Sequence, residues 1–412
     1  MTNSTPRYRW WVLALVFLAN FLPTGMAWFY IVVMVTNVCQ DLSVDIVEFS
    51  KLWAGISLGA FLFCVPGGAL GDRLGVRKVV GGGILLMGAS LLWRAQAPSF
   101  GSMFGAMVLF GACIALVAPN LPKALGQWFP PSEFGFANGA ALAGNGAGQA
   151  LALSVGPLLL GPLGGWRVIT RLLGLVLLGI GALWIATLRD RETSVGGGNA
   201  LAALRAVTAV RAVWMLSGAY MLFLGGYIGV VQYLPTYYEQ VQGMSKAAAG
   251  GMMSLVLIAY VVGSLALPTF SDHLGLRKRV YVPGMLLTSA IVFAAAVVTG
   301  APLAAVMVAW GLAAGVVAIL FVVPLELAGV GPANAGSALG LALAAGFGGG
   351  FVSPVVGSML ASRNPLAGVG FWAACFAGSA LLFSLIPETG PRAVRETPAG
   401  GSELSTASVG HN

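Results

Sequence analysis

Long apolar runs dominate this chain and leave it few folds to choose from. Taking about 20 apolar residues as one membrane crossing, the sequence contains twelve such runs. Because 58% of the 412 residues are hydrophobic and only 8% are charged, polar side chains are too few to cover a soluble globule. We predict an all-α integral membrane protein with twelve transmembrane helices. The runs lie near residues 10–36, 49–70, 79–97, 101–125, 135–160, 166–188, 212–237, 246–270, 280–299, 302–327, 334–360 and 366–387.

The runs form two sets of six, because the longest polar break lies near the middle of the chain. We expect an N-terminal six-helix bundle over residues 1–188 and a C-terminal six-helix bundle over residues 212–388, joined by a cytoplasmic linker over residues 189–211. Residues 389–412 lack an apolar period and are rich in small and polar residues, which predicts a disordered cytoplasmic tail. The first run is longer than a signal-peptide core and has no convincing cleavage site, so we expect a retained spanning helix.

Lysine and arginine residues predict the orientation of the chain. If both termini are cytoplasmic, 15 of the 21 basic residues lie on the cytoplasmic side, in agreement with the positive-inside rule. We therefore expect a multi-pass protein of the inner (plasma) membrane. Arg94 and Arg171 lie toward the outer ends of the third and sixth helices, and we expect both to snorkel toward the membrane surface.

Several other functions are excluded by what the sequence contains. The net charge of +8 is scattered over short loops, so no nucleic-acid partner is expected. Two histidines and four widely spaced cysteines do not form a metal site, and neither a metal nor a cofactor is expected. The stretch from Gly55 through Ser57 to Gly59 fits the nucleophile elbow of serine hydrolases, but it lies inside a predicted spanning helix and has no histidine partner. We therefore do not expect an enzyme.

One polar motif occurs twice, 200 residues apart, at the end of the second run of each half. Each copy combines an acidic residue, a glycine that permits a tight turn and a basic pair that opens the next helix. The motif resembles the loop between helices 2 and 3 of the major facilitator superfamily, with its weaker copy between helices 8 and 9. The resemblance implies two pseudo-symmetric six-helix bundles that rock about a central site. The residues concerned are Gly68, Asp72, Arg73, Gly75, Arg77 and Lys78 in the first copy, and Asp272, Gly275, Arg277 and Lys278 in the second.

In that family the motif holds the halves together on the cytoplasmic side when the carrier faces outward. By pseudo-symmetry, Asp72 is expected to face the start of helix 11 at residues 332–337, and Asp272 the start of helix 5 at residues 132–135, where a helix dipole favours negative charge. The alternative is that these charges only cap helices and set the topology. Because the second copy has Pro268 and His273 in place of glycine and arginine, we expect Asp72 to matter more than Asp272.

The fifth helix carries a polar, glycine-rich stretch from Gly144 to Gln149 that resembles the signature of nitrate and nitrite porters. Those porters bind the anion through arginines in the middle of helices 2 and 8, and neither helix has one here. The stretch from Pro119 to Pro130, with residues 324–327 in the second half, is similar to the cyanate-permease-like branch of anion porters. Small residues four apart on helices 2, 5, 8 and 11 indicate close contacts along the seam between the halves.

The solute site of such a carrier is expected near mid-membrane between the halves. Asn145 and Gln149 are the strongest pair, because residues four apart share one helical face. The alternative is that such amides only tie helices together. No acid lies at the centre of a crossing, which leaves uniport, exchange, or coupling through Lys123 and Glu326 near the helix ends. The substrate-binding candidates are Asn20, Thr24, Tyr30, Asn145, Gln149, Tyr220, Tyr227, Gln232 and Tyr260.

These observations predict a monomeric transporter in the lipid bilayer. Its partners would be a small polar or anionic solute and, in the coupled cases, a co-transported or exchanged ion. One alternative is an efflux pump for lipophilic compounds, with apolar cavity walls from Phe61, Phe63, Trp310 and Phe347. An alternative of another class is a membrane sensor or scaffold that kept the fold and lost transport.

Overall fold

The computed structural model describes residues 5–190, 205–327 and 329–390, and over these ranges every regular element is a helix. The first half of the chain begins with a broken helix made of α1, η1, α2, η2 and α3, and its fourth crossing is divided into α6, η3 and α7. The bounds in this half are α1 Thr5–Ala19, η1 Asn20–Met26, α2 Ala27–Phe29, η2 Tyr30–Met34, α3 Val35–Leu42, α4 Ile46–Leu74, α5 Val76–Gln96, α6 Phe100–Val117, η3 Ala118–Asn120, α7 Leu121–Gly126, α8 Pro131–Leu159 and α9 Trp166–Thr187.

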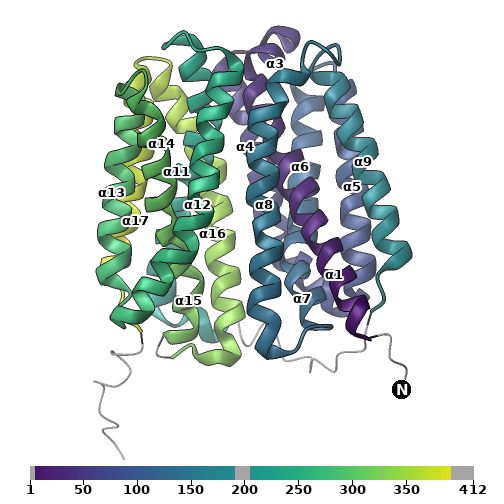
Figure 1. Cartoon of the computed structure of the whole chain (residues 1–412), viewed down its shortest axis with the longest axis vertical. Helices are drawn as coiled ribbons and strands as arrows, with labels where there is room; N and C mark the ends of the chain where they lie inside the picture. Colours follow the sequence, from purple (N-terminus) through teal and green to yellow (C-terminus); the bar gives the residue numbers. More distant parts are fainter. Residues whose placement is uncertain (1–4, 191–204, 328, 391–412) are drawn as a thin grey trace, which may run out of the picture.

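The second half repeats this arrangement with an unbroken first crossing. Its fourth crossing is again interrupted, here by the short 3₁₀ segment η4. The bounds are α11 Arg211–Gln240, α12 Lys246–Leu274, α13 Lys278–Val297, α14 Pro302–Ala314, η4 Gly315–Ala318, α15 Ile319–Glu326, α16 Gly331–Ala361 and α17 Pro365–Ser384. Figure 1 shows the two halves side by side, with α1 beginning at the lower face of the molecule. We use "lower" and "upper" for the two faces as they appear in that view.

Eleven helices of the described residues are long and apolar enough to cross a membrane. The remaining expected run, near residues 135–160, is α8, which crosses the molecule from the lower to the upper face like its neighbours (Figure 1). It is less apolar than the others because it carries Asn145, Gln149 and six glycines. The predicted all-α membrane fold is therefore confirmed. Of the expected linker and tail, residues 191–204 and 391–412 lie outside the described residues, so the domain boundaries stay a prediction.

The first crossing is broken because proline and non-α hydrogen bonding interrupt it. Pro23 lies inside the π-helix η1 and supplies no backbone N–H, and a 3₁₀ segment follows at η2. Proline and local π or 3₁₀ geometry are the usual causes of a change of direction in a helix. All of η2 is buried. The break therefore alters which side chains the first helix turns toward the centre of the molecule.

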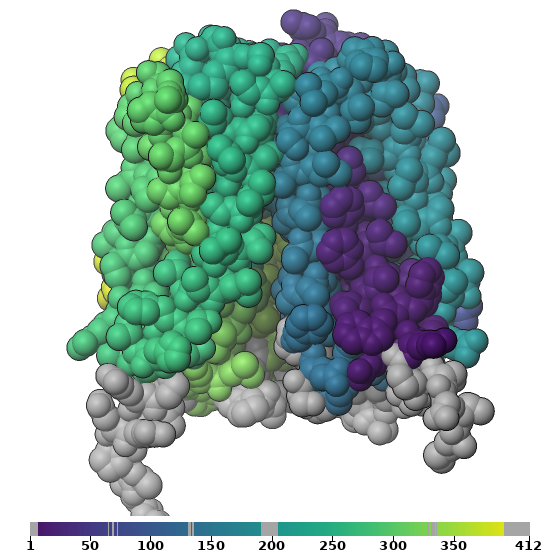
Figure 2. Space-filling view, in the orientation of Figure 1, coloured from purple at the N-terminus to yellow at the C-terminus, as the bar shows by residue number. Residues whose placement is uncertain are grey.

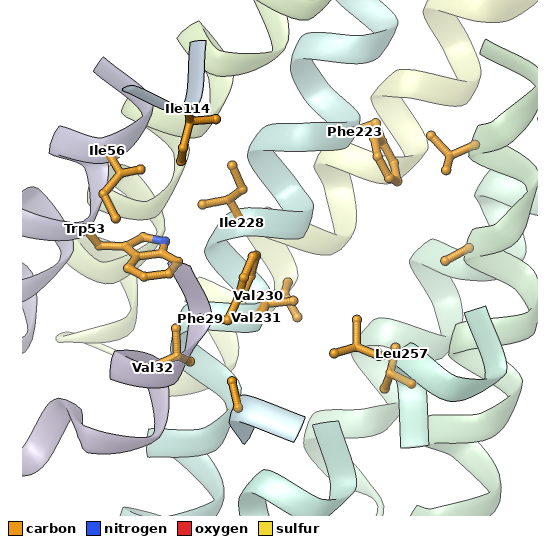
Figure 3. Packing of buried hydrophobic residues seen from close by; sticks show 14 of the residues in the cluster. Phe29, Val32, Trp53, Ile56, Ile114, Phe223, Ile228, Val230, Val231 and Leu257 are labelled. Atoms are coloured by element: carbon orange, nitrogen blue, oxygen red, sulfur yellow. The ribbon is translucent and has the colours of Figure 1, made fainter. Parts of the chain in front are cut away.

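The two halves meet tightly toward the upper face. The hydroxyl groups of Ser50 on α4 and Ser358 on α16 lie 2.6 Å apart across the seam. A methyl group on Gly250 of α12 would collide with the carbonyl oxygen of Leu153 on α8, so these helices touch backbone to backbone. Buried side chains of both halves, among them Trp53 and Ile228, fill this region (Figure 3). The upper side of the seam is closed.

The lower side of the seam is open. A Cβ atom added to Gly139 of α8, or to Gly336 or Gly340 of α16, would meet no atom within 4 Å. Phe136 on α8 and Leu265 on α12 are 66% and 67% exposed. Figure 2 shows the corresponding hollow between the halves, with α16 visible at its back. The seam between the halves is therefore closed toward the upper face and open toward the lower face.

Candidate functional site

Close packing of α8 on the broken first helix builds the centre of the molecule. A methyl group on Gly144 would lie 2.7 Å from the carbonyl oxygen of Phe17, and one on Gly148 would collide with the carbonyl oxygen of Phe21. Only glycine permits this approach, as is usual where membrane helices touch. The contact brings Thr24 of η1 within hydrogen-bonding distance of α8.

A chain of four hydrogen-bonded side chains runs from there across the seam. The Asn145 Nδ2 group donates to Thr24 Oγ1 at 3.0 Å, and Gln149 Nε2 donates to Asn145 Oδ1 at 2.6 Å. The Tyr227 hydroxyl, on α11 of the other half, donates to Gln149 Oε1 at 2.8 Å. We call Thr24, Asn145, Gln149 and Tyr227 the central network. It joins the two halves through neutral groups.

The chemistry of the central network suits a polar ligand that both donates and accepts, or an anion. Amide N–H and hydroxyl groups supply donors, and the amide oxygens supply acceptors. Thr24 and Gln149 are buried, whereas Asn145 and Tyr227 are only partly buried. A solute entering from the lower hollow could replace the link between Tyr227 and Gln149 without leaving either group unpaired, which would otherwise be costly.

The other predicted substrate residues lie in different places. Asn20 donates to the Val16 carbonyl within the first helix, and the Tyr30 hydroxyl pairs with Thr170 on α9 at 2.8 Å. Tyr220 is buried against Phe321, inside the C-terminal half. Tyr260 is half-buried on α12, and Gln232 is buried in the upper seam. The structure thus joins the side chains of Thr24, Asn145, Gln149 and Tyr227, and Thr24 also donates to the backbone carbonyl of Asn20 at 2.9 Å. The side chains of the remaining five candidates form no hydrogen bond with that network among the described residues.

Two residues of the seam were missed by the sequence analysis. Ser50 donates to Gln232 Oε1 at 3.2 Å and lies against Ser358. Both serines occur in apolar runs on helices already expected to form the seam, so a search for hydroxyls on those helices would have found them. Ser57, part of the apparent nucleophile elbow, lies within the continuous helix α4.

The upper seam is also held by charged and polar groups. Lys246 of α12 donates to Asn37 Oδ1 of α3 at 2.6 Å and lies 3.6 Å from Glu239 of α11. Thr36 donates to the same Glu239 carboxylate at 3.5 Å. Each half therefore contributes partners to one cluster above the central network.

In the second motif copy, the Arg277 guanidinium is buried, being 4% exposed. It donates to Glu326 at 2.6 Å and to Asp272 of its own loop, and its backbone N–H donates to Glu388 at 2.7 Å. The hydrogen bonds that Arg277 donates to Glu326 raise the pKa of Arg277 above its ordinary value. In this lower-open structure Asp272 thus pairs within its own half.

The first copy is anchored in a similar way. Arg77 Nε donates to the Ile185 carbonyl at 2.6 Å, and its backbone N–H donates to Asp190 at 2.9 Å. Gly75 and Gly275 have φ of +84° and +70°, values that favour glycine at both turns. The side chains of Asp72 and of residues 131, 132, 134, 135, 331–333 and 335 are not described, so the predicted latch contacts at these positions stay a prediction.

Arg94 corrects one expectation. It is fully buried and lies 4.9 Å from the ring of Phe110 on α6, and none of its guanidinium nitrogens has a hydrogen-bond partner among the described residues. The expected snorkelling is wrong for Arg94, because its side chain is enclosed by the N-terminal half. Arg171 is exposed, and its expected snorkelling stays a prediction.

The repeated fold, the central network and the open hollow define a membrane carrier of two six-helix halves. The family model of the Major Facilitator Superfamily matches residues 13–354, so the chain belongs to that family. This is a family of transport proteins and not of enzymes, and the membership confirms the resemblance on which the fold was predicted.

The names of two curated relatives refer to the transport of nitrate or nitrite. The chain is 27% identical over 273 residues to a Thermus thermophilus protein named "probable nitrate/nitrite antiporter", covering 62% of this chain and 60% of that protein. It is 26% identical over 228 residues to the nitrite extrusion protein of Bacillus subtilis, covering 55% and 56%. The chain thus matches less than two thirds of the length of each. Both names agree with the predicted resemblance to anion porters.

Among solved structures, the chain is similar to a bacterial homologue of the human lysosomal transporter Spinster in an inward-facing, unoccupied conformation. The TM-score is 0.76 at 15% identity, covering 93% of this chain and 96% of that one. At this identity the likeness shows the fold alone.

Proposed function

We propose that this protein moves a small polar or monovalent anionic solute across the membrane by alternating access. The central network carries the proposal, because it links the halves directly above the hollow that opens to the lower face. With the upper seam closed and the lower side open, a solute can reach Asn145 and Tyr227 from one side only. A rocking motion of the halves would expose the same groups to the other side.

The class of solute follows from the groups at the network and from the relatives. The network residues are uncharged, so they suit a neutral polar molecule or an anion of low charge, whose desolvation is least costly. The anion names of two relatives favour an anion. Since α4 and α12 have no arginine in their middle portions, a site built on paired arginines is not proposed.

Orientation follows from the distribution of charge. The lower face would be cytoplasmic, because described basic residues that are predicted to be cytoplasmic, such as Arg77, Lys123 and Arg277, lie on loops and helix ends toward that face. The protein would then reside in the inner membrane with the structure open to the cytoplasm. Because the network and the hollow lie within one chain, a monomer would suffice, with or without an exchanged ion.

Transport by purified protein in proteoliposomes tests this proposal. Uptake of isotopically labelled nitrite, nitrate, cyanate and acetate is measured for the wild type and for Gln149→Leu and Tyr227→Phe. Losing one hydrogen bond of about 0.5–1.5 kcal/mol should raise KM roughly 3–10-fold in Tyr227→Phe, and Gln149→Leu should lower flux further because it leaves two partners unpaired.

Tyr30→Phe is the matched control, since the Tyr30 hydroxyl bonds within the N-terminal half and its loss should leave KM unchanged. Transport of an anion is refuted if the wild type moves no member of the panel, and the role of the central network is overturned if Tyr227→Phe transports like the wild type. Binding of a solute without any flux would instead support the sensor class.

A further inference from the structure

A polar strip on α4 faces the C-terminal half in the upper seam. Ser50, Trp53 and Ser57 are spaced by three and four residues, so they share one face of the helix. Ser50 bonds to Gln232 of α11 and Ser358 of α16. Farther down, Ser57 lies beside Gly350 of α16, since a Cβ added there would be 2.8 Å from Ser57 Oγ.

Three polar groups on this strip and the facing helix are buried without a partner. Trp53, Ser57 and Gln232 are 1%, 1% and 0% exposed. Within the described part of the chain, Trp53 Nε1, Ser57 Oγ and Gln232 Nε2 make no hydrogen bond. In Figure 3 the indole nitrogen of Trp53 points toward Ile228 of α11. Ile228 also lies against Gly350, so an apolar surface faces these polar groups while the seam is closed.

The unpartnered groups share one chemical character. An indole N–H and the NH₂ of an amide only donate hydrogen bonds, and a serine hydroxyl can donate. The oxygen of Gln232 lies 3.2 Å from Ser50 Oγ, and the NH₂ group of the same amide is the end without a partner among the described residues. No acidic residue lies on α4 between Ser50 and Ser57. Such a set cannot bind a metal cation, which needs oxygen ligands, but it suits an anion.

We propose that Trp53, Ser57 and Gln232 form a second solute station, for a monovalent anion, which becomes available when the seam opens to the upper face. The station rests on the proposed function, because only a rocking motion would separate Ile228 and Gly350 from α4. Exposed Lys51, beside Ser50 at the upper end of α4, adds a positive charge at the entrance that attracts anions. A low anion charge is required because the station contains no cation.

Anion-dependent stability of the purified full-length protein tests the station. Unfolding temperature is measured against sodium nitrate, nitrite, chloride and thiocyanate, with sodium gluconate keeping the ionic strength constant. A ligand of the folded state raises that temperature by mass action. We expect at least one anion to stabilise the wild type, and Trp53→Phe and Ser57→Ala each to weaken its apparent affinity by about 3–10-fold, the effect of one lost hydrogen bond.

Two matched controls separate this effect from general effects of salt. Trp184→Phe removes another buried, unpartnered indole N–H, which lies against Gly81 inside the N-terminal half. Ser353→Ala removes a buried hydroxyl beside Gly225 inside the C-terminal half. Both controls should respond to anions like the wild type.

A conformational readout completes the test. In a background without native cysteines, Gly139→Cys reports opening of the lower hollow to an impermeant maleimide. An anion held at the upper station should slow this labelling, and the slowing should vanish in Trp53→Phe/Ser57→Ala. The station is refuted if no anion stabilises the wild type, or if the double variant responds fully. If the station is refuted but flux depends on Tyr227, the proposed function is still supported. If anions stabilise the protein and slow the labelling of Gly139→Cys but no flux is detected, the station is supported and transport is not.

Discussion

At the scale of single residues, the four-residue spacing on α8 was a sound guide, whereas Tyr220 and Gln232 lie outside the central network although α11 is unbroken. Asn145 and Gln149 were paired by their four-residue spacing, and they do share a hydrogen bond. Tyr30 was expected at the solute site but bonds to Thr170 instead. The π-helix and 3₁₀ segment of the first crossing change its helical register, which a regular 3.6-residue period cannot anticipate.

The buried Arg277 pairs with two carboxylates, Glu326 and Asp272, which differ in exposure. We therefore expect their removal to cost different amounts of stability. Glu326→Gln should lower the free energy of unfolding by about 3 kcal/mol, because it removes a close partner of an almost fully buried charge. Asp272→Asn is the control and should cost less than about 1 kcal/mol, since that carboxylate is 58% exposed. Denaturant unfolding in detergent measures both variants, and equal losses would contradict the account.

The raised pKa of Arg277 predicts how pH affects the stability that its ion pairs contribute. A raised pKa in the folded state stabilises the protein at every pH below the ordinary arginine value. That contribution is lost only as the pH rises beyond it. Titration of Arg277 should therefore leave stability unchanged across the neutral range.

At the scale of elements, glycine has two distinct uses on α8. Gly144 and Gly148 let the broken first helix approach, whereas Gly139 faces the open hollow. The small-residue spacing predicted contacts on α8 as a whole, but sequence alone could not say which glycines touch a neighbour in a given state. That depends on how far the two halves are tilted apart.

This difference predicts opposite outcomes for two identical changes on one helix. Gly148→Ala should lower the free energy of unfolding by about 1–3 kcal/mol, as overpacking does, and should weaken the bond between Thr24 and Asn145. Gly139→Ala should leave stability equal or higher, because alanine is the better helix former by about 1 kcal/mol. Thermal unfolding of the two purified variants measures the contrast, and a matching loss in both would argue against the described packing.

At the scale of the whole molecule, the fold was predictable because hydrophobic run length and an internal repeat both specify it. Twelve runs, a central polar break and two copies of one loop motif define two similar halves. The conformation was not predictable, because the same sequence must support states open to either face with nearly equal free energy. The closed upper seam, with Ser50, Gln232 and Ser358 in contact, is visible only in the structure.

The central claim is that solute passes only if the upper seam opens. A Ser50→Cys/Ser358→Cys variant tests it most directly, because the two hydroxyl oxygens lie 2.6 Å apart across the seam, close enough for a disulfide to form. Uptake of the transported probe anion into proteoliposomes is measured before and after reduction, with each single variant as control. We predict that the oxidised double variant is inactive and that reduction restores flux. Undiminished transport by the fully cross-linked protein would contradict alternating access through this seam.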